Sequence, residues 1–176
     1  DVAALILSPG VPLTHPKPHP VVVKAREADC EIIGDVELFF SAVRPEDDAV
    51  HPKIVCVTGT NGKSTTTALI GHLLSRLGFD AEIGGNIGKP VLDLAPPTPR
   101  RAYVIELSSY QIDLTPSLRP DVGVLINITP DHIDRHGTIE HYANVKANIF
   151  ARQGRGDIAV IGVDDPHSSE ICTRIS

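Results

Sequence analysis

Residues 54–67 read Ile-Val-Cys-Val-Thr-Gly-Thr-Asn-Gly-Lys-Ser-Thr-Thr-Thr, and this stretch decides the fold. A short apolar run meets a Gly-Lys-Ser turn, and a helix-forming run at 68–74 follows. This order of strand, glycine loop and helix gathers backbone N–H groups at a helix N-terminus, where the helix dipole favours anions. Lys63 would add a cation for the β- and γ-phosphates of a nucleotide, and Ser64 a hydroxyl ligand for Mg²⁺.

The loop is a compact variant of the common phosphate-binding pattern. That pattern has a glycine five residues before Gly62, where this chain has Val57. We therefore do not expect a member of the common P-loop kinase or GTPase families. The plain alternative is a Gly/Asn turn between a strand and a helix, but Lys-Ser directly after the second glycine favours a phosphate loop.

Composition limits the classes of protein that fit. The 176 residues suffice for one domain or for parts of two. Aromatic residues make up only 4%, so aliphatic side chains must fill the core, and a net charge of −6 argues against broad nucleic-acid binding. The three distant cysteines suggest reduced thiols in a cytoplasmic protein. No run has the ~20 apolar residues of a membrane span, and no signal peptide is visible. We expect a monomer without nucleic-acid or membrane partners.

The chain divides at a polar, proline-containing segment, 43–52, which we interpret as a linker. Before it we expect a strand at 2–7, a proline-rich loop, a helix near 21–28, a strand at 31–33 and a helix capped by Asp35. Residues 1–48 would be the C-terminal part of one domain, a Rossmann-like remnant. Residues 49–176 would be the N-terminal part of a second. The chain starts at Asp1 and contains no methionine, so we expect a fragment.

The second block alternates strands and helices, which predicts an α/β fold: a P-loop-type, mostly parallel sheet with helices on both faces. In such sheets, ligands bind beyond the carboxyl ends of the strands. The expected strands are 54–57, 80–83, 102–106, 122–126 and 158–161, and the expected helices are 64–77, 89–94 and 139–150.

Two strand ends carry polar side chains suited to chemistry. Glu106 ends an otherwise apolar strand, and a buried acid there needs a cation, so we favour Mg²⁺ over a solvent-exposed glutamate. After the 122–126 strand, His132 and His136 have the spacing of a helical zinc pair, but the glutamate of H-E-x-x-H is absent. We favour Asp131 capping a short helix, with His132 toward the nucleotide site and His136 without a role.

Two further candidates give weak signals from pattern alone. Glycines at 84, 85 and 88 would let the backbone approach a ligand closely, and Asn86 offers an amide to a polar ligand; a plain turn is the alternative. Lys146 lies in an amphipathic helical pattern and would be solvated on composition alone.

Several motifs together resemble the Mur ligases of peptidoglycan synthesis. They are G-T-N-G-K-S-T from Gly59, G-G-N-I-G from Gly84, E-L-S-S-Y-Q from Glu106, N-I-T-P-D-H-I-D-R-H from Asn127 and Y-x-x-x-K ending at Lys146. S-P-G-V-P-L from Ser8 and E-I-I-G-D-V-E-L-F-F from Glu31 narrow the resemblance to the D-glutamate-adding branch. The resemblance covers nearly the whole chain.

The resemblance implies an ATP-dependent amide ligase of cell-wall biogenesis, on which cell shape and division depend. Its small-molecule substrates would be UDP-N-acetylmuramoyl-L-alanine and D-glutamate. ATP would convert the carboxylate to an acyl phosphate, and the amine of D-glutamate would then displace phosphate. Lys63 and Mg²⁺ would neutralise the approaching anions.

The resemblance also implies roles for individual residues. Gly59, Thr60, Asn61, Gly62, Lys63, Ser64 and Thr65 would hold ATP phosphates. Ser64 and Glu106 would bind one Mg²⁺, and Glu106, His132 and a carbamylated Lys146 a second. Lys63, His132 and Lys146 would be catalytic. Asn86, Ser108 and His132 would face the muramoyl-alanine part, and Ser8, Pro9 and Gly10 would line the nucleotide-sugar site.

The family has three domains, so the resemblance implies that the first is incomplete here and that the third, which brings D-glutamate, is absent. We expect the isolated chain to bind nucleotide weakly and not to complete ligation. The alternatives are another Mur ligase, folylpolyglutamate synthetase, or a P-loop nucleotide-binding module without ligase activity.

Overall fold

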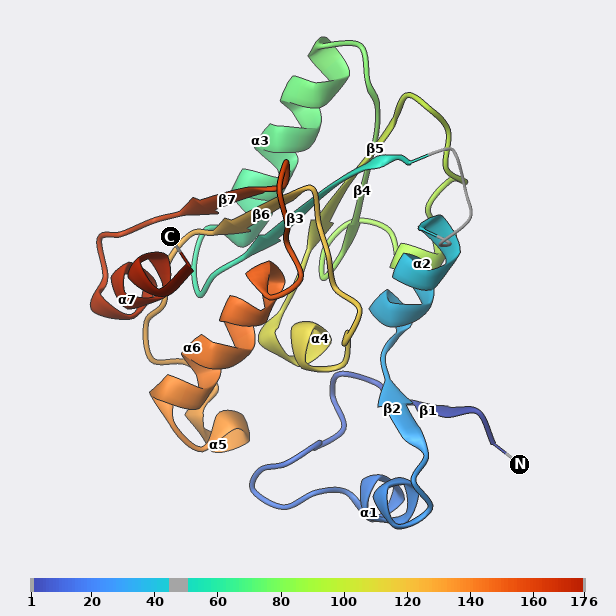
Figure 1. Ribbon diagram of the computed structural model, residues 1–176, viewed down its shortest axis with the longest axis vertical. Coiled ribbons are helices and arrows are strands. Elements are labelled where there is room, and N and C mark those ends of the chain that lie inside the picture. Colours follow the sequence, from blue (N-terminus) through green and yellow to red (C-terminus); the bar gives the residue numbers. More distant parts are fainter. Residues whose placement is uncertain (1, 45–50, 176) are drawn as a thin grey trace.

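The computed structural model describes residues 2–44 and 51–175 and has the expected α/β architecture (Figure 1). Its main sheet has five parallel strands in the order β4-β5-β3-β6-β7. Their bounds are β3 (Lys53–Thr58), β4 (Asp80–Gly85), β5 (Arg101–Glu106), β6 (Val122–Leu125) and β7 (Ile158–Ile161). All five strands expected after the linker are confirmed. The central strands β3 and β5 are almost wholly buried, as their continuous apolar runs require.

Helices cover both faces of this sheet, and each face buries alternate side chains of the strands. Helix α3 (Lys63–Arg76) packs on one face, over Val55, Val57 and Val104. The opposite face buries Ile54, Cys56, Tyr103 and Ile105 in the largest core cluster. Elements that pack there are α2 (Asp35–Val43), the 3-10 turn η1 (Val91–Asp93), α4 (Ser109–Asp113), α6 (Ile139–Ala147), the 3-10 turn η2 (Asn148–Phe150) and α7 (Pro166–Ile175).

The first part of the chain forms a small parallel pair of strands at the lower end of Figure 1. Strand β1 (Ala4–Ile6) pairs with β2 (Glu31–Ile33), and α1 (Pro20–Glu27) connects them. Leu7 and Val22 pack with Leu114, which directly follows α4. The Gly34 N–H also donates to the Leu114 carbonyl at 2.8 Å, so this unit is attached to the main domain near the carboxyl end of β5.

Several local expectations are wrong. Gly34, not Asp35, is the N-cap of α2, because Gly34 has the extended backbone and Asp35 is already helical. The helix expected at 89–94 is only η1, since Lys89 forms a bridge with Gly84 and Pro90 has an extended ψ of 142°. The sequence pattern does not predict helices α4 and α7. The proposed linker falls partly on residues 45–50, which lie outside the described residues.

Candidate active site

The phosphate loop lies between β3 and α3, as the sequence predicts. Gly62 is the N-cap of α3 with a left-handed φ of 83°, which glycine adopts without strain. The first N–H groups of a helix lack intrahelical partners, so the turn beginning at Lys63 presents donors to an anion. The Lys63 ammonium donates to the Thr60 carbonyl at 2.9 Å and therefore folds back over the loop. Ser64 and Thr65 are exposed on the first turn.

Asn127, at the end of β6, fixes the shape of this loop. Its side-chain oxygen accepts from the N–H groups of Thr60 at 3.2 Å and Asn61 at 2.9 Å, and its amide donates to the Asn61 carbonyl at 3.2 Å. Sequence reasoning did not assign Asn127 a role. The sequence signals were its position after a predicted strand and its place at the start of the N-I-T-P-D-H motif. Neither shows that β6 lies beside β3, which is what brings Asn127 to the loop.

Glu106 is buried at the carboxyl end of β5, with an exposed fraction of 1%. Its Oε1 atom accepts from the Asn86 amide at 2.9 Å. Its Oε2 atom is buried without a hydrogen-bond partner among the described residues. An unsatisfied carboxylate oxygen is costly unless a cation or donor is bound there, so this atom fits a Mg²⁺ ligand.

The Gly-Gly-Asn turn holds the end of β4 against β5. A Cβ atom at Gly85, which has a φ of 101°, would overlap the Glu106 carbonyl oxygen. The glycine therefore permits close approach of β4 to β5, and its neighbour Asn86 donates its N–H to the same carbonyl at 2.9 Å. Asn86 is thus held on Glu106 by both its backbone and its side chain.

Lys146 is the most unexpected residue of the site, because its side chain is buried at 1% exposure. From α6 it donates to the Gly59 carbonyl at 2.9 Å and to the Thr58 hydroxyl at 3.2 Å, and it lies 4.7 Å from the Tyr142 ring centroid. Burial, with Lys63 nearby as a second positive charge, lowers the pKa of Lys146 to about 7. The expectation of a solvated lysine from composition is wrong.

The two histidines of the 127–137 segment differ sharply. His132 has a left-handed φ of 53° and is the N-cap of α5 (Ile133–His136), so Asp131 is not the cap as expected. Asp131 instead accepts from the His132 N–H at 2.9 Å. The His132 ring is half exposed and lies 5.2 Å from the Tyr110 ring. His136 is buried, and Gly137 ends the helix after it.

Two other predicted groups lie beside these residues. Ser108 is the N-cap of α4 in a capping box with Gln111, so its hydroxyl already has a structural partner. The Ser8-Pro9-Gly10 loop follows β1, and the Gly10 carbonyl accepts from Arg135 at 3.3 Å. Within the described parts of the chain, no three His, Cys, Asp or Glu side chains form a preformed metal cluster.

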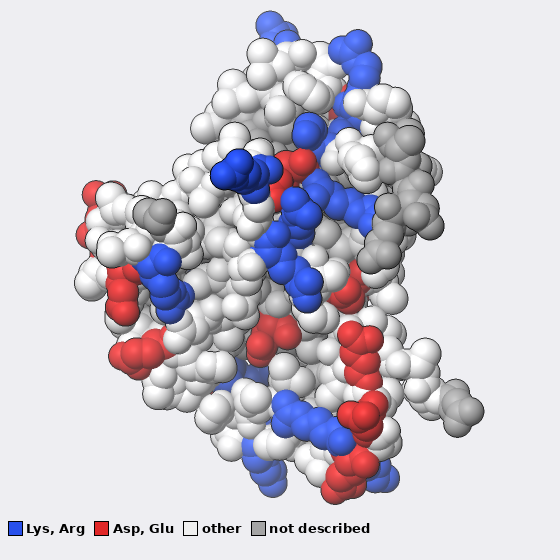
Figure 2. All heavy atoms as spheres, in the orientation of Figure 1, with Lys and Arg blue, Asp and Glu red and all other residues white. Residues whose placement is uncertain are grey.

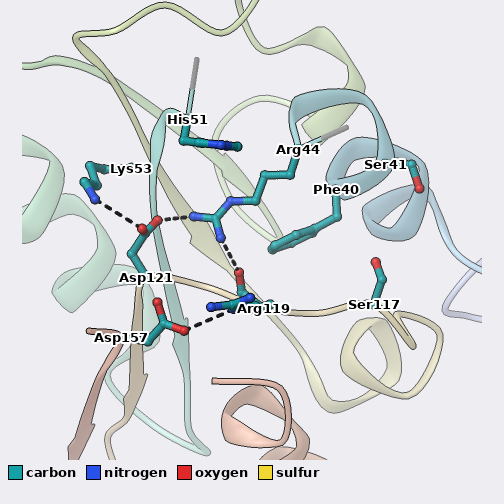
Figure 3. Close-up of a pocket in the computed structure, with 9 residues that line it drawn as sticks. All are labelled: Phe40, Ser41, Arg44, His51, Lys53, Ser117, Arg119, Asp121 and Asp157. Atoms are coloured by element: carbon teal, nitrogen blue, oxygen red, sulfur yellow. Dashed lines mark hydrogen bonds and ion pairs between the residues drawn. The ribbon is translucent and has the colours of Figure 1, made fainter. Parts of the chain in front are cut away.

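A cavity of about 690 Å³ lies away from these residues (Figure 3). It opens at the amino ends of the strands, where Lys53 begins β3 and Asp121 precedes β6. Lys and Arg side chains gather on this face with acidic residues among them (Figure 2). Arg44 and Lys53 both contact Asp121, and Arg119 pairs with Asp157. Because the cations are paired and ligands bind at the opposite end of such sheets, we interpret the cavity as a structural junction between α2 and the sheet.

A parallel sheet with a compact phosphate loop and a buried acid at the neighbouring strand end is typical of α/β domains that bind nucleotide phosphates. The family model of the Mur ligase middle domain matches residues 57–176, more than half of the chain. The chain therefore belongs to the Mur ligase family.

Curated relatives agree with this assignment. The chain is 58% identical over all of its 176 residues to the UDP-N-acetylmuramoylalanine--D-glutamate ligase of Caulobacter sp. strain K31, and 59% identical over 99% of its length to that of Rhodopseudomonas palustris strain HaA2. It spans only 38% and 37%, respectively, of the length of these relatives.

Solved structures support the fold. A MurF ligase from Thermotoga maritima, solved in complex with ADP, matches 87% of the chain, with 42% of its own length covered, at a TM-score of 0.57 and 20% identity. The UDP-N-acetylmuramate:L-alanyl-gamma-D-glutamyl-meso-diaminopimelate ligase from Neisseria meningitides matches 87%, with 51% of its own length covered, at a TM-score of 0.59 and 19% identity. No helix in the described residues is long and apolar enough to cross a membrane.

Proposed function

We propose that the complete protein containing this chain is an ATP-dependent ligase that joins D-glutamate to UDP-N-acetylmuramoyl-L-alanine in peptidoglycan synthesis. The observation that carries the proposal is the 57–59% identity, over essentially the whole chain, to proteins named for this reaction. The site geometry supports it, because a phosphate loop, an unsatisfied buried carboxylate and a buried lysine meet at one end of the sheet. Residues 1–48 would belong to the UDP-substrate domain and residues 49–176 to the central domain.

The chemistry requires a carboxylate, a poor electrophile, to acquire a leaving group. Phosphorylation by ATP gives an acyl phosphate, and the D-glutamate amine attacks its carbonyl carbon to form a tetrahedral intermediate. Phosphate leaves as the C–O bond breaks, and the amine loses a proton. The protein must bring anions together, so its main task is to position them and to neutralise their charge.

Residues of this chain would divide that task. Gly59–Thr65 would hold the ATP phosphates, with Lys63 turning from the Thr60 carbonyl toward the β- and γ-phosphates. Asn127 keeps the loop shaped for them. Ser64 and Glu106 would hold one Mg²⁺, and Glu106, His132 and Lys146 a second. Mg²⁺, when bound, supplies charge neutralisation at the phosphate oxygens.

Lys146 needs a chemical change to become a metal ligand, since an ammonium has no lone pair. Because the pKa of Lys146 is lowered to about 7, a large fraction of the amine is neutral at neutral pH. A neutral amine can attack CO₂, forming an N–C bond and releasing one proton, and the product is a carbamate with carboxylate-like oxygens. We infer that burial prepares Lys146 for this modification.

The substrate side of the site would be built around His132 and Asn86, which would face the muramoyl-alanine part. Ser108 would contribute from the start of α4, and Ser8, Pro9 and Gly10 would line the nucleotide-sugar site. The Arg135 guanidinium supports placing the Ser8–Gly10 loop beside the rest of the substrate site. It donates to the Gly10 carbonyl and lies 4.9 Å from the Tyr110 ring centroid.

A substrate panel tests the proposal with the complete protein. ADP formation is measured with UDP-N-acetylmuramoyl-L-alanine or a folate as acceptor, each with D-glutamate, L-glutamate or meso-diaminopimelate. We expect turnover only with the muramoyl acceptor and D-glutamate. Turnover with the folate would assign the protein to the folylpolyglutamate synthetases, and a preference for another amino acid would assign it to a different Mur ligase. Binding of ATP without turnover on any combination of acceptor and amino acid would identify the protein as a nucleotide-binding module without ligase activity.

A further inference from the structure

A cluster of aromatic rings lies beneath the candidate site, centred on His136. The His136 ring is parallel to Tyr110 within 5°, at a centroid distance of 5.3 Å. The Tyr142 ring lies 5.2 Å from it on another side, and the His141 ring 5.7 Å away. His136 is 3% exposed, so it is the buried centre of this cluster.

Two hydrogen bonds hold His136, one made by its ring and one by its backbone. Its Nε2 atom lies 2.9 Å from the hydroxyl of Ser109, which is also buried, and its backbone N–H donates to the His132 carbonyl at 3.1 Å. Burial, with His141, Lys146, His132 and Arg135 as neighbouring positive or titratable groups, lowers the pKa of His136 to about 4. The ring is therefore neutral and can stack in the core without the cost of a buried charge.

The cluster contacts the candidate site at two places. On one side, Tyr110 lies 5.2 Å from the His132 ring. On the other, the Tyr142 hydroxyl lies 3.3 Å from the Thr60 hydroxyl in the phosphate loop, and the Tyr142 ring lies 4.7 Å from the Lys146 ammonium. The His132 ring is half exposed, and its contacts are with the Tyr110 ring and, at 3.5 Å, with the Asp131 carboxylate.

We propose that His136 is a positioning residue, which holds Tyr110 and Tyr142 and thereby orients His132 on one side and Lys146 on the other. The inference rests on the proposed function, in which those two residues act together. A structural role alone would need only an apolar side chain of similar volume. A positioning role needs the flat ring between two tyrosines and the hydrogen bond to Ser109, which sets its rotation.

A matched set of variants of the complete protein separates these roles. His136→Leu fills the volume without a ring, His136→Phe restores the ring without the hydrogen bond, and Ser109→Ala removes only the hydrogen-bond partner. His72→Gln, on an exposed site of α3, is the control. The readouts are kcat and KM for ATP, and the His132 ring signal in ¹³C-histidine NMR, assigned by its loss in His132→Gln.

We expect His136→Leu to lower kcat about tenfold with little change in KM, since a small misplacement of reacting groups acts mainly on the rate. It should also shift the His132 signal, because the Tyr110 ring moves. His136→Phe should recover most of kcat and of the signal, and Ser109→Ala should give a smaller change of the same kind. The control should match the wild type.

Two results would overturn the proposal. One is a His136→Leu protein that is less stable but keeps wild-type kcat and an unmoved His132 signal. The other is a loss of kcat in His136→Leu that His136→Phe does not recover. If His136→Leu does not fold, Ser109→Ala decides, and an unmoved His132 signal there contradicts the inference. If the wild type has no D-glutamate-dependent turnover, the proposed function fails, while the NMR comparison still tests the ring cluster.

Discussion

The Lys146 ammonium lies 2.9 Å from the carbonyl oxygen of Gly59, the first glycine of the phosphate loop. This contact brings the last turn of α6 to the end of β3, across more than 80 residues of sequence. A lysine with 1% exposure is expensive to bury, and no carboxylate pairs with it among the described residues. A buried, unpaired lysine costs stability, and a role in the reaction would explain why it is kept. Lys146 is therefore the clearest target for mutation.

Replacing Lys146 with methionine should stabilise the fold near pH 7 and abolish ligase activity. The folded pKa is about 7 against the ordinary 10.5, so the unfolded chain binds more protons between these values. Wild-type stability therefore rises with pH across that window and is lowest, relative to the variant, at and below pH 7. The shift corresponds to a few kcal/mol, more than the ~1 kcal/mol that each of the two lost hydrogen bonds contributes.

The measurement is urea unfolding of wild type and Lys146→Met from pH 6.5 to 10.5. The stability advantage of the variant should shrink as the pH rises. A variant less stable than wild type at pH 7 would contradict the buried-charge account.

Glu106→Gln should weaken binding of the metal ion and lower ligase activity. The substitution keeps the side-chain shape and an oxygen for the Asn86 amide, but it replaces the unsatisfied carboxylate oxygen by a donor or a weaker ligand. We expect a loss of about 10²-fold or more in kcat/KM, the scale of a lost charge-stabilising group. Titration with Mn²⁺, followed by electron paramagnetic resonance in the presence of ATP, reports binding directly. Glu82→Gln on β4, where the carboxylate pairs with Lys89 and Arg101, is the control, and equal Mn²⁺ affinity in both variants would exclude Glu106 as a ligand.

Asn127→Ala should weaken ATP binding without a large loss of stability. The substitution removes the acceptor for the Thr60 and Asn61 N–H groups, so the loop samples other shapes and binding must restore order. We expect an increase in Kd of about tenfold, or ~1.4 kcal/mol, by calorimetry. Asn148→Ala, at an exposed position after α6, is the matched control. A loop that binds ATP equally well in Asn127→Ala would show that Asn127 is dispensable for its shape.

Acid should destabilise the fold through His136. Its folded pKa of about 4 lies below the ordinary 6.5, so the unfolded chain binds more protons between these values. Titration of His136 therefore leaves the free energy of unfolding unchanged above pH 6.5. It lowers that free energy as the pH falls, and the loss is complete near pH 4. Unfolding of wild type and His136→Phe between pH 4 and 7.5 should show a steeper loss in wild type. Parallel curves would mean that His136 is not buried as a neutral ring.

Most of the strand and helix pattern after the linker could be predicted because β3, β5, β6 and β7 contain short apolar runs and α3 begins at a distinctive glycine loop. The pattern does not predict α4, because this short helix depends on the capping box of Ser108 and Gln111 rather than on periodicity. It predicts too long a helix at η1, because Pro90 has an extended backbone. Burial of Lys146 and His136 could not be predicted from spacing. It depends on how α5 and α6 pack beneath the loop, and a lysine in an amphipathic pattern is ordinarily solvated.

The most direct test of the central claim is phosphate release by the complete protein with ATP, Mg²⁺ and UDP-N-acetylmuramoyl-L-alanine, with and without D-glutamate. We expect sustained release only when D-glutamate is present, matched one-to-one by the D-glutamyl product in mass spectrometry, and lost in Lys146→Met. Sustained release that is indifferent to D-glutamate, or that persists in Lys146→Met, would contradict it.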